Sequence, residues 1–174
     1  MQKRETDMLD VEYEVADENK RSVYVPGMAK DMLIGGRDSG NVFIFCLNDE
    51  LRKSIAAKVA EKLGRKFVII SRSDGNPVLN EVATGDNQIV SMPRGAVKSE
   101  KNRELLKSNG KVITIMSDFM TLLNASDGSD DAREQISLML NRFEPNFMEA
   151  SHHIVRSDQS EDEILQDVLD KIAI

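Results

Sequence analysis

The fold class is decided by residues 41–64, which read NVFIFCLNDELRKSIAAKVAEKLG. Residues 42–47 are continuously apolar, which is typical of a central parallel strand buried on both faces. A helix is predicted next, because Asn48 or Asp49 can cap its start and Gly64 supplies its C-terminal stop. Its apolar stripe recurs at every fourth position, at Leu51, Ile55, Val59 and Leu63. The stretch therefore predicts a buried strand followed directly by an amphipathic helix.

The same alternation of strand and helix continues toward the C-terminus. Further strands are predicted at residues 67–70, 88–92, 111–116 and around 153–156. Helices are predicted from the Ser99 cap to Asn109, from about residue 132 to 143, and after a capping box of Ser160 and Glu163. Alternation of this kind is the signature of a mostly parallel sheet covered on both faces. The sequence predicts a three-layer α/β domain over residues 41–174, with five strands and flanking helices.

The first forty residues follow a different pattern. Apolar and acidic residues alternate over residues 9–15, which is the period of a half-buried strand, and Val23-Tyr-Val25 ends at Pro26-Gly27. We predict an N-terminal extension over residues 1–40, with a β-hairpin and a short helix. Since an added strand with an exposed edge can pair with another chain, this extension is the candidate contact for a homodimer or a protein partner.

Composition excludes several classes of partner. The chain has 174 residues, 40% of them apolar, so it can bury one hydrophobic core. Its net charge of -7 disfavours binding to the phosphate backbone of a nucleic acid or to an anionic membrane. Neither nucleic acid nor membrane is expected as a partner. The single Cys46 and two adjacent histidines give no zinc-type spacing, so no metal site is expected. A lone cysteine and the absence of any long apolar stretch favour a cytoplasmic location.

Three segments in order carry a resemblance to a known family. Residues 41–64 resemble the strand, P-loop and helix that open shikimate kinases, and residues 89–97 (IVSMPRGAV) resemble the family's Gly-Gly-Gly-Ala-Val segment. Residues 141–150 (NRFEPNFMEA) and 160–163 resemble the family's ending. The resemblance covers roughly residues 41–174. It implies a five-stranded parallel sheet of the nucleoside-monophosphate kinase (P-loop kinase) type.

The P-loop itself departs from the family pattern. Its glycines align with Cys46, Asp49 and Leu51, its lysine with Arg52 and its magnesium-binding hydroxyl with Lys53. A non-glycine residue in the left-handed conformation costs about 1 to 2 kcal/mol, so the loop should relax into another shape. Asp49 and Glu50, placed in the first helical turn, would repel a triphosphate from the positive end of the helix dipole. The alternative is that they are ordinary helix-capping acids, with the same consequence for ATP.

What remains of the cofactor site is a short basic run. The resemblance implies vestigial cofactor contacts at Arg52, Lys53 and Ser54, although a shift of one position to use Lys53-Ser54 puts Arg52 where a glycine belongs. Solvated helix charges are the alternative. The family's Asp-x-Asp, which serves the metal and the substrate hydroxyls, aligns with Ile69 and Ser71. No catalytic residue, no metal and no cofactor are therefore expected.

The substrate side of the site is eroded as well, but it offers candidate contacts for an anion. The resemblance implies anion contacts at Arg94, Gly95 and Arg142, with surface ion pairs as the alternative for the two arginines. Pro93 and Arg94 replace two glycines that let the backbone approach the substrate. The stretch between Ser71 and Gln88 is shorter than a shikimate-binding subdomain.

Three hypotheses follow from these residues. The first is a shikimate kinase-like protein that has lost ATP binding and phosphotransfer and acts in binding or assembly. The second is a divergent kinase that phosphorylates shikimate or another small hydroxy acid, with ATP and Mg²⁺ held in an atypical phosphate site. The third is a binding module for a small anion without chemistry.

Overall fold

A five-stranded parallel sheet forms the centre of this computed structural model, which describes residues 38–174. Its strands are β1 (Val42–Cys46), β2 (Lys66–Ile69), β3 (Gln88–Ser91), β4 (Lys111–Met116) and β5 (His153–Arg156). They lie in the order β2-β3-β1-β4-β5, so the first strand of the described chain is the central one. Val42 pairs with Ile89 on one side and Lys111 on the other, and every pairing is parallel.

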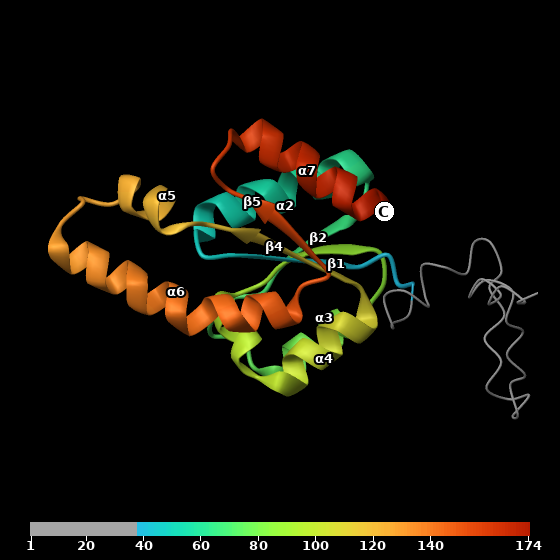
Figure 1. Cartoon of the computed structure of the whole chain (residues 1–174). Helices are drawn as coiled ribbons and strands as arrows, with labels where there is room; N and C mark the ends of the chain where they lie inside the picture. The colour runs from blue at the N-terminus through green and yellow to red at the C-terminus, as the bar shows by residue number, and fades with distance from the viewer. Residues whose placement is uncertain (1–37) are drawn as a thin grey trace, which may run out of the picture.

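Helices cover both faces of the sheet (Figure 1). The six α-helices of the described residues are α2 (Asp49–Leu63), α3 (Asn76–Thr84), α4 (Glu100–Asn109), α5 (Phe119–Asn124), α6 (Asp130–Ala150) and α7 (Glu161–Ala173), and η3 (Arg94–Lys98) is a 3-10 helix. Helices α2 and α7 lie on one face, and α3, α4 and α6 lie on the other. The predicted three-layer α/β fold with five parallel strands is confirmed.

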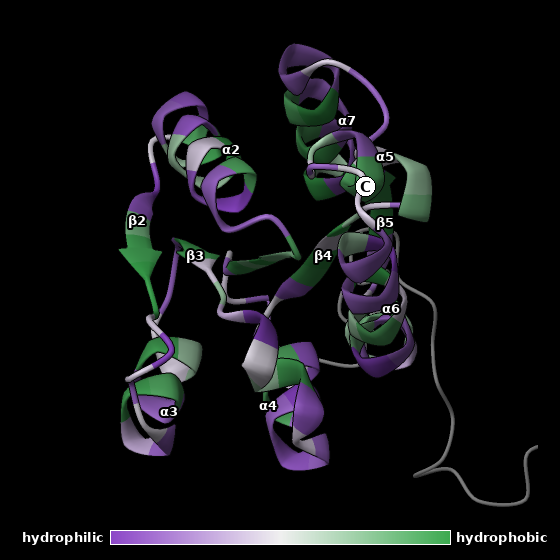
Figure 2. Cartoon of the chain, turned by 90° about the vertical axis from the view of Figure 1, so that its left-hand side faces the viewer, coloured by the Kyte–Doolittle hydropathy of each residue, from purple (hydrophilic) through white to green (hydrophobic). Residues whose placement is uncertain are grey.

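Two hydrophobic cores result, one on each face of the sheet (Figure 2). In β1, Val42, Ile44 and Cys46 pack with α2 and α7, whereas Phe43 and Phe45 pack with the helices of the other face. This explains the continuously apolar run of residues 42–47, because successive strand side chains point to opposite faces.

Most of the predicted element boundaries are confirmed. Asn48 caps α2, Ser99 caps α4, and Gly64 ends α2 with φ at 62°, in the left-handed region that favours glycine. The capping box of Ser160 and Glu163 forms at the start of α7. The predicted extension over residues 1–40 lies outside the described residues, except for its last three.

Three parts of the secondary-structure prediction were wrong. Helices α3 and α5 were not predicted, and α6 continues seven residues past Phe143, through Pro145. The stripe of α2 also differs from the prediction, because Leu63 is 38% exposed while Arg52 is buried. The buried face of this helix consists of Arg52, Ile55, Ala56, Val59 and Ala60.

None of the helices described over residues 38–174 is both long enough and apolar enough to cross a membrane.

Candidate functional site

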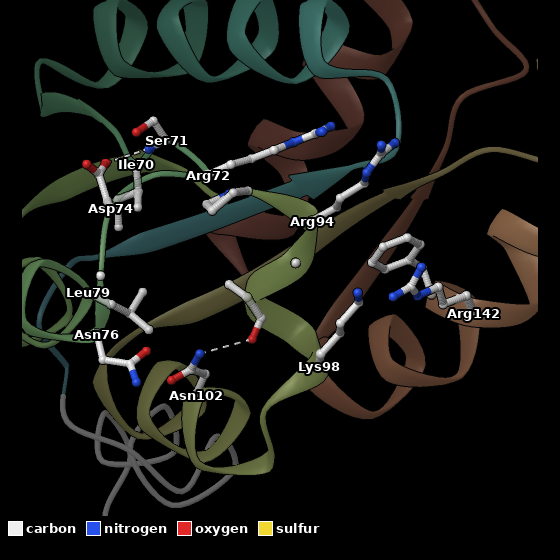
Figure 3. A pocket seen from close by; sticks show the side chains of 15 residues that line it. Ile70, Ser71, Arg72, Asp74, Asn76, Leu79, Arg94, Lys98, Asn102 and Arg142 are labelled. Atoms are coloured by element: carbon white, nitrogen blue, oxygen red, sulfur yellow. Dashed lines mark hydrogen bonds between the residues drawn. The ribbon is translucent and has the colours of Figure 1, made fainter.

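A pocket of about 460 Å³ opens at the carboxyl ends of β2 and β3 (Figure 3). The carboxyl ends of the strands are where open α/β sheets bind their ligands. The segments Ile70–Asn76 and Pro93–Lys98, which follow these two strands, supply most of the lining, and α6 contributes Arg142 and Phe143. The pocket therefore gathers residues that lie far apart in the sequence.

Three cations of the pocket surround one aromatic ring. The Cζ atoms of Arg94 and Arg142 lie 5.6 and 5.9 Å from the centre of the Phe143 ring, and Lys98 Nζ lies 5.2 Å from it. Phe143 itself is buried and stacks on Phe147, which fixes its position. The negative face of the ring holds the cations together without neutralising them.

None of these three cations forms an ion pair within residues 38–174. The interpretation of Arg94 and Arg142 as members of surface ion pairs is therefore wrong. The structure brings Arg94, Gly95 and Arg142 together as pocket lining, and their role in binding stays a prediction. Lys98 was missed, because an exposed lysine at the end of a short 3-10 helix carries no sequence signal of its own.

One carboxylate also lines the pocket. Asp74 follows β2 by five residues, and its Oδ2 accepts a hydrogen bond of 2.6 Å from the backbone N–H of Ser71. The two positions that align with the carboxylates of the family's Asp-x-Asp are Ile69 and Ser71, neither of which is acidic. Asp74 was not among the predicted site residues, and the turn over residues 71–74 carries it back toward the pocket.

The start of α2 lies beside this pocket and is occupied by an internal ion pair. Arg52 is 3% exposed, and its Nε donates to Ser91 Oγ over 2.9 Å. Its Nη1 donates to Asp49 Oδ1 over 2.7 Å and to the carbonyl of Cys46 over 3.4 Å. Asp49 Oδ2 also lies 3.4 Å from Nη2 of Arg72, a residue that lines the pocket. The guanidinium of Arg52 thus bridges the ends of β1 and β3.

The backbone donors at the start of α2 are also engaged within the protein. Asn48 Oδ1 accepts from the N–H groups of Glu50 and Leu51, each over 3.1 Å, and the Asn48 carbonyl accepts from the N–H of Arg52 over 3.0 Å. Only two residues, Leu47 and Asn48, connect β1 to α2, and Leu47 is buried. A helix start capped in this way offers few free N–H groups to an anion.

The other two predicted cofactor contacts face away from Arg52. Lys53 Nζ lies 3.8 Å from Glu50 on the same helix. Ser54 Oγ donates to Glu161 of α7, which also pairs with Lys58 over 2.7 Å. Both hydrogen bonds lower the pKa of Glu161. The structure therefore does not bring Arg52, Lys53 and Ser54 together around one point.

Cys46 lies next to the Arg52 guanidinium at the end of β1. Burial raises the pKa of its thiol to about 11, so the thiol is neutral at physiological pH. Within residues 38–174, no three His, Cys, Asp or Glu side chains gather as a metal ion would require.

Comparison with known proteins places this geometry in a family. The family model of shikimate kinase matches residues 47–173. The shikimate kinase of Salinibacter ruber (strain DSM 13855 / M31) is 26% identical over an alignment 137 residues long, which covers 69% of this chain. The chain spans 65% of the length of that curated relative.

Solved structures share the fold. Shikimate kinase from Acinetobacter baumannii in complex with shikimate superposes with a TM-score of 0.64 at 19% identity, over 76% of this chain and 92% of that one. Shikimate kinase from Bacteroides thetaiotaomicron gives a TM-score of 0.63 at 16% identity, over 77% and 98% of the two chains. With the family model matching most of the sequence, the chain belongs to the shikimate kinase family.

Proposed function

We propose that this protein is a non-catalytic member of the shikimate kinase family, which does not use ATP as a phosphate donor and which binds a small anionic molecule in the pocket beside η3. No cofactor is needed for this function. The extension over residues 1–40 is the proposed contact for a second copy or a protein partner.

The observation that carries the proposal is the internal use of the Arg52 side chain. In the register of the family, Arg52 stands where a lysine would contact the transferred phosphate. Here its guanidinium is buried on Ser91 and Asp49, so a nucleotide phosphate would have to break a charge-assisted hydrogen bond of 2.7 Å before reaching it. The displaced carboxylate of Asp49 would then stand beside the incoming phosphate and repel it.

The local charge adds a second barrier. Asp49 and Glu50 stand in the first turn of α2, and Asn48 already satisfies the N–H groups of Glu50 and Leu51. Two carboxylates at this position repel the polyphosphate of a nucleotide, whereas a helix start that binds phosphate offers free N–H groups. The internal pairing of Arg52 and the negative charge of the first turn therefore both oppose binding of a nucleotide.

The pocket supports the binding part of the proposal. Three cations without a carboxylate partner face a cavity large enough for a small organic molecule. An unpaired cation near a pocket is a recognition group for an acidic ligand.

One observation favours the divergent kinase instead. Asp74 lines the pocket and is positioned by the Ser71 N–H, as a general base for a substrate hydroxyl would need to be. Under this alternative, ATP and Mg²⁺ would bind outside the α2 start, and the acceptor would be shikimate or another small hydroxy acid.

Calorimetric titration of the full chain with ATP and Mg²⁺ tests the proposal, with an assay of ADP release in the presence of shikimate run in parallel. We expect no binding heat up to millimolar ATP and no ADP above the background without protein. Micromolar binding of ATP, or release of ADP that depends on shikimate, would refute the proposal. Loss of that release in Asp74→Asn would then assign the base.

A further inference from the structure

We infer that the ligand of this pocket is a small organic acid with at least two negatively charged groups, the second of which is bound by Arg94. This inference rests on the proposed function only in taking the pocket as a binding site for an anion. It adds the chemical class of the ligand and the residue that selects it.

The charge of the pocket carries the first step. Arg94, Lys98 and Arg142 have no carboxylate within ion-pair distance among residues 38–174, and Asp74 is the one carboxylate in the lining. Three such cations and one carboxylate leave two positive charges in excess. Arg72 is not counted among the three, because it lies 3.4 Å from Asp49, although Asp49 is shared with Arg52 and Arg72 can only add to the positive charge. A ligand with one carboxylate would leave a cation of the pocket without a counter-charge.

The arrangement of the cations carries the second step. Figure 3 shows Arg94 extending toward the start of α2, alongside Arg72, while Lys98 and Arg142 approach each other at the α6 side. Arg94 also contacts Met139 of α6 through Nη1 over 3.4 Å, so its side chain is held by packing and not by a charge. Positive charge therefore lies at two places in the pocket, one at Arg94 and one at Lys98 and Arg142, which favours a ligand with two separate acidic groups.

The rest of the lining indicates a carbon skeleton between these groups. Ile70 and Leu79 are buried side chains that contribute apolar surface to the pocket. Asn76 supplies an amide beside them, and Asn102 donates to the carbonyl of Ala96 over 3.3 Å. A pocket of about 460 Å³ lies within the usual range for small-molecule sites and exceeds what a bare phosphate ion would fill.

Arg94 is the selecting residue because of where it stands. It begins η3, directly after the buried Pro93, at a position that aligns with a glycine of the family's Gly-Gly-Gly segment. A side chain at this position adds a guanidinium to the pocket wall, where glycine would add none. Arg94 is therefore assigned to the second acidic group, and Lys98 with Arg142 to the first.

Isothermal titration of the full chain with a matched pair of probes tests the inference. The probes are cyclohexanecarboxylate and cis-cyclohexane-1,3-dicarboxylate, and inorganic phosphate is the third arm. We expect the dicarboxylate to bind at least tenfold more tightly than the monocarboxylate, and phosphate to bind more weakly than the dicarboxylate. Equal affinities for the two carboxylates, no binding of the dicarboxylate, or tightest binding of phosphate would overturn the inference.

Variants locate the second acidic group. Arg94→Gln should lower the affinity for the dicarboxylate at least tenfold and leave the monocarboxylate unchanged, whereas Lys98→Gln should weaken both probes. Arg133→Gln, on the exposed surface of α6 and outside the pocket, is the matched control. An Arg94→Gln protein that keeps its preference for the dicarboxylate would refute the assignment. Binding of ATP would refute the proposed function without affecting these results, so the two failures are distinguishable.

Discussion

Asp49 is the residue on which the start of α2 depends. Its carboxylate is shared by the buried Arg52 and the exposed Arg72, so one side chain of the protein holds two guanidiniums that would otherwise attract an external anion. The Asp49 side chain is 38% exposed, whereas that of Arg52 is 4% exposed. This difference in exposure decides which substitution costs more stability. Removing the Asp49 carboxylate leaves the buried guanidinium of Arg52 without a charged partner, whereas removing Arg52 leaves a carboxylate that water can hydrate.

Replacing Asp49 by alanine should therefore destabilise the protein. We expect a loss of about 1 to 3 kcal/mol in the free energy of unfolding, since the buried guanidinium loses its charged partner. Glu50→Ala removes an acid from the same helical turn, but that side chain is 89% exposed and should cost less than about 0.5 kcal/mol. Urea denaturation of both variants measures the difference, and equal costs would show that the Arg52 pair contributes nothing specific.

The residues of the site were only partly predictable from sequence. Arg94 and Arg142 were identified because each lies in a segment that resembles the family. Lys98 was not, because an exposed lysine at the end of a short 3-10 helix carries no signal of its own, and Asp74 was not, because it lies outside the segments that resemble the family. The burial of Arg52 was also missed, since a charged residue in a helix rich in charge reads as solvated unless its partners across the fold are known.

Among the elements, the predictable ones carry their own boundary signals. The strands of the core and the capped helices α2, α4 and α7 follow from apolar runs and cap residues. Helix α3 was missed because Gly75 caps it without a side chain and it has only nine residues, and α5 has only six. Short helices of this kind are stabilised by tertiary packing more than by local sequence.

Helix α6 contains the clearest conflict between local signal and structure. Pro145 lies within its 21 residues and cannot donate a backbone hydrogen bond, yet the helix continues to Ala150 because Phe147 and Ala150 are fully buried. Packing of this last turn outweighs the helix-breaking effect of proline. The helix was predicted to end at Phe143, because the burial of Phe147 and Ala150 depends on tertiary contacts that the local sequence does not reveal.

Pro145→Ala should accordingly stabilise the protein. The exposed alanine restores one backbone hydrogen bond and removes the clash of the ring with the preceding turn, so we expect a gain of about 1 to 3 kcal/mol in the free energy of unfolding. Glu144→Ala, at the exposed neighbouring position, should change it by less than about 0.5 kcal/mol. Chemical denaturation of the two variants measures both changes in the free energy of unfolding. A Pro145→Ala protein that is less stable than the original would mean that the proline ring makes a favourable contact.

At the scale of the molecule, the two hydrophobic cores of the described residues are formed by side chains of residues 42–172. The segment just before β1 is nevertheless bonded to the domain. The Ser39 carbonyl accepts from the N–H of Asn87 over 2.8 Å, the Gly40 carbonyl accepts from Arg65 Nη1 over 2.7 Å, and Ser39 Oγ donates to the carbonyl of Asn109. Within the described residues, hydrogen bonds to the rest of the domain therefore begin at Ser39, two residues before the boundary predicted at residue 41.

A chain of residues 38–174 should fold on its own, because it keeps both cores of the described residues and these hydrogen bonds. A chain of residues 41–174 is the matched control. It loses the three hydrogen bonds of Ser39 and Gly40 and should be less stable than residues 38–174 by about 1.5 to 4.5 kcal/mol, at roughly 0.5 to 1.5 kcal/mol for each bond. Equal stability of the two truncated chains would contradict this account.

Sedimentation of the full chain and of residues 38–174 tests the proposed contact through residues 1–40. A dimer that becomes a monomer on truncation supports this contact, and a monomer in both cases refutes it.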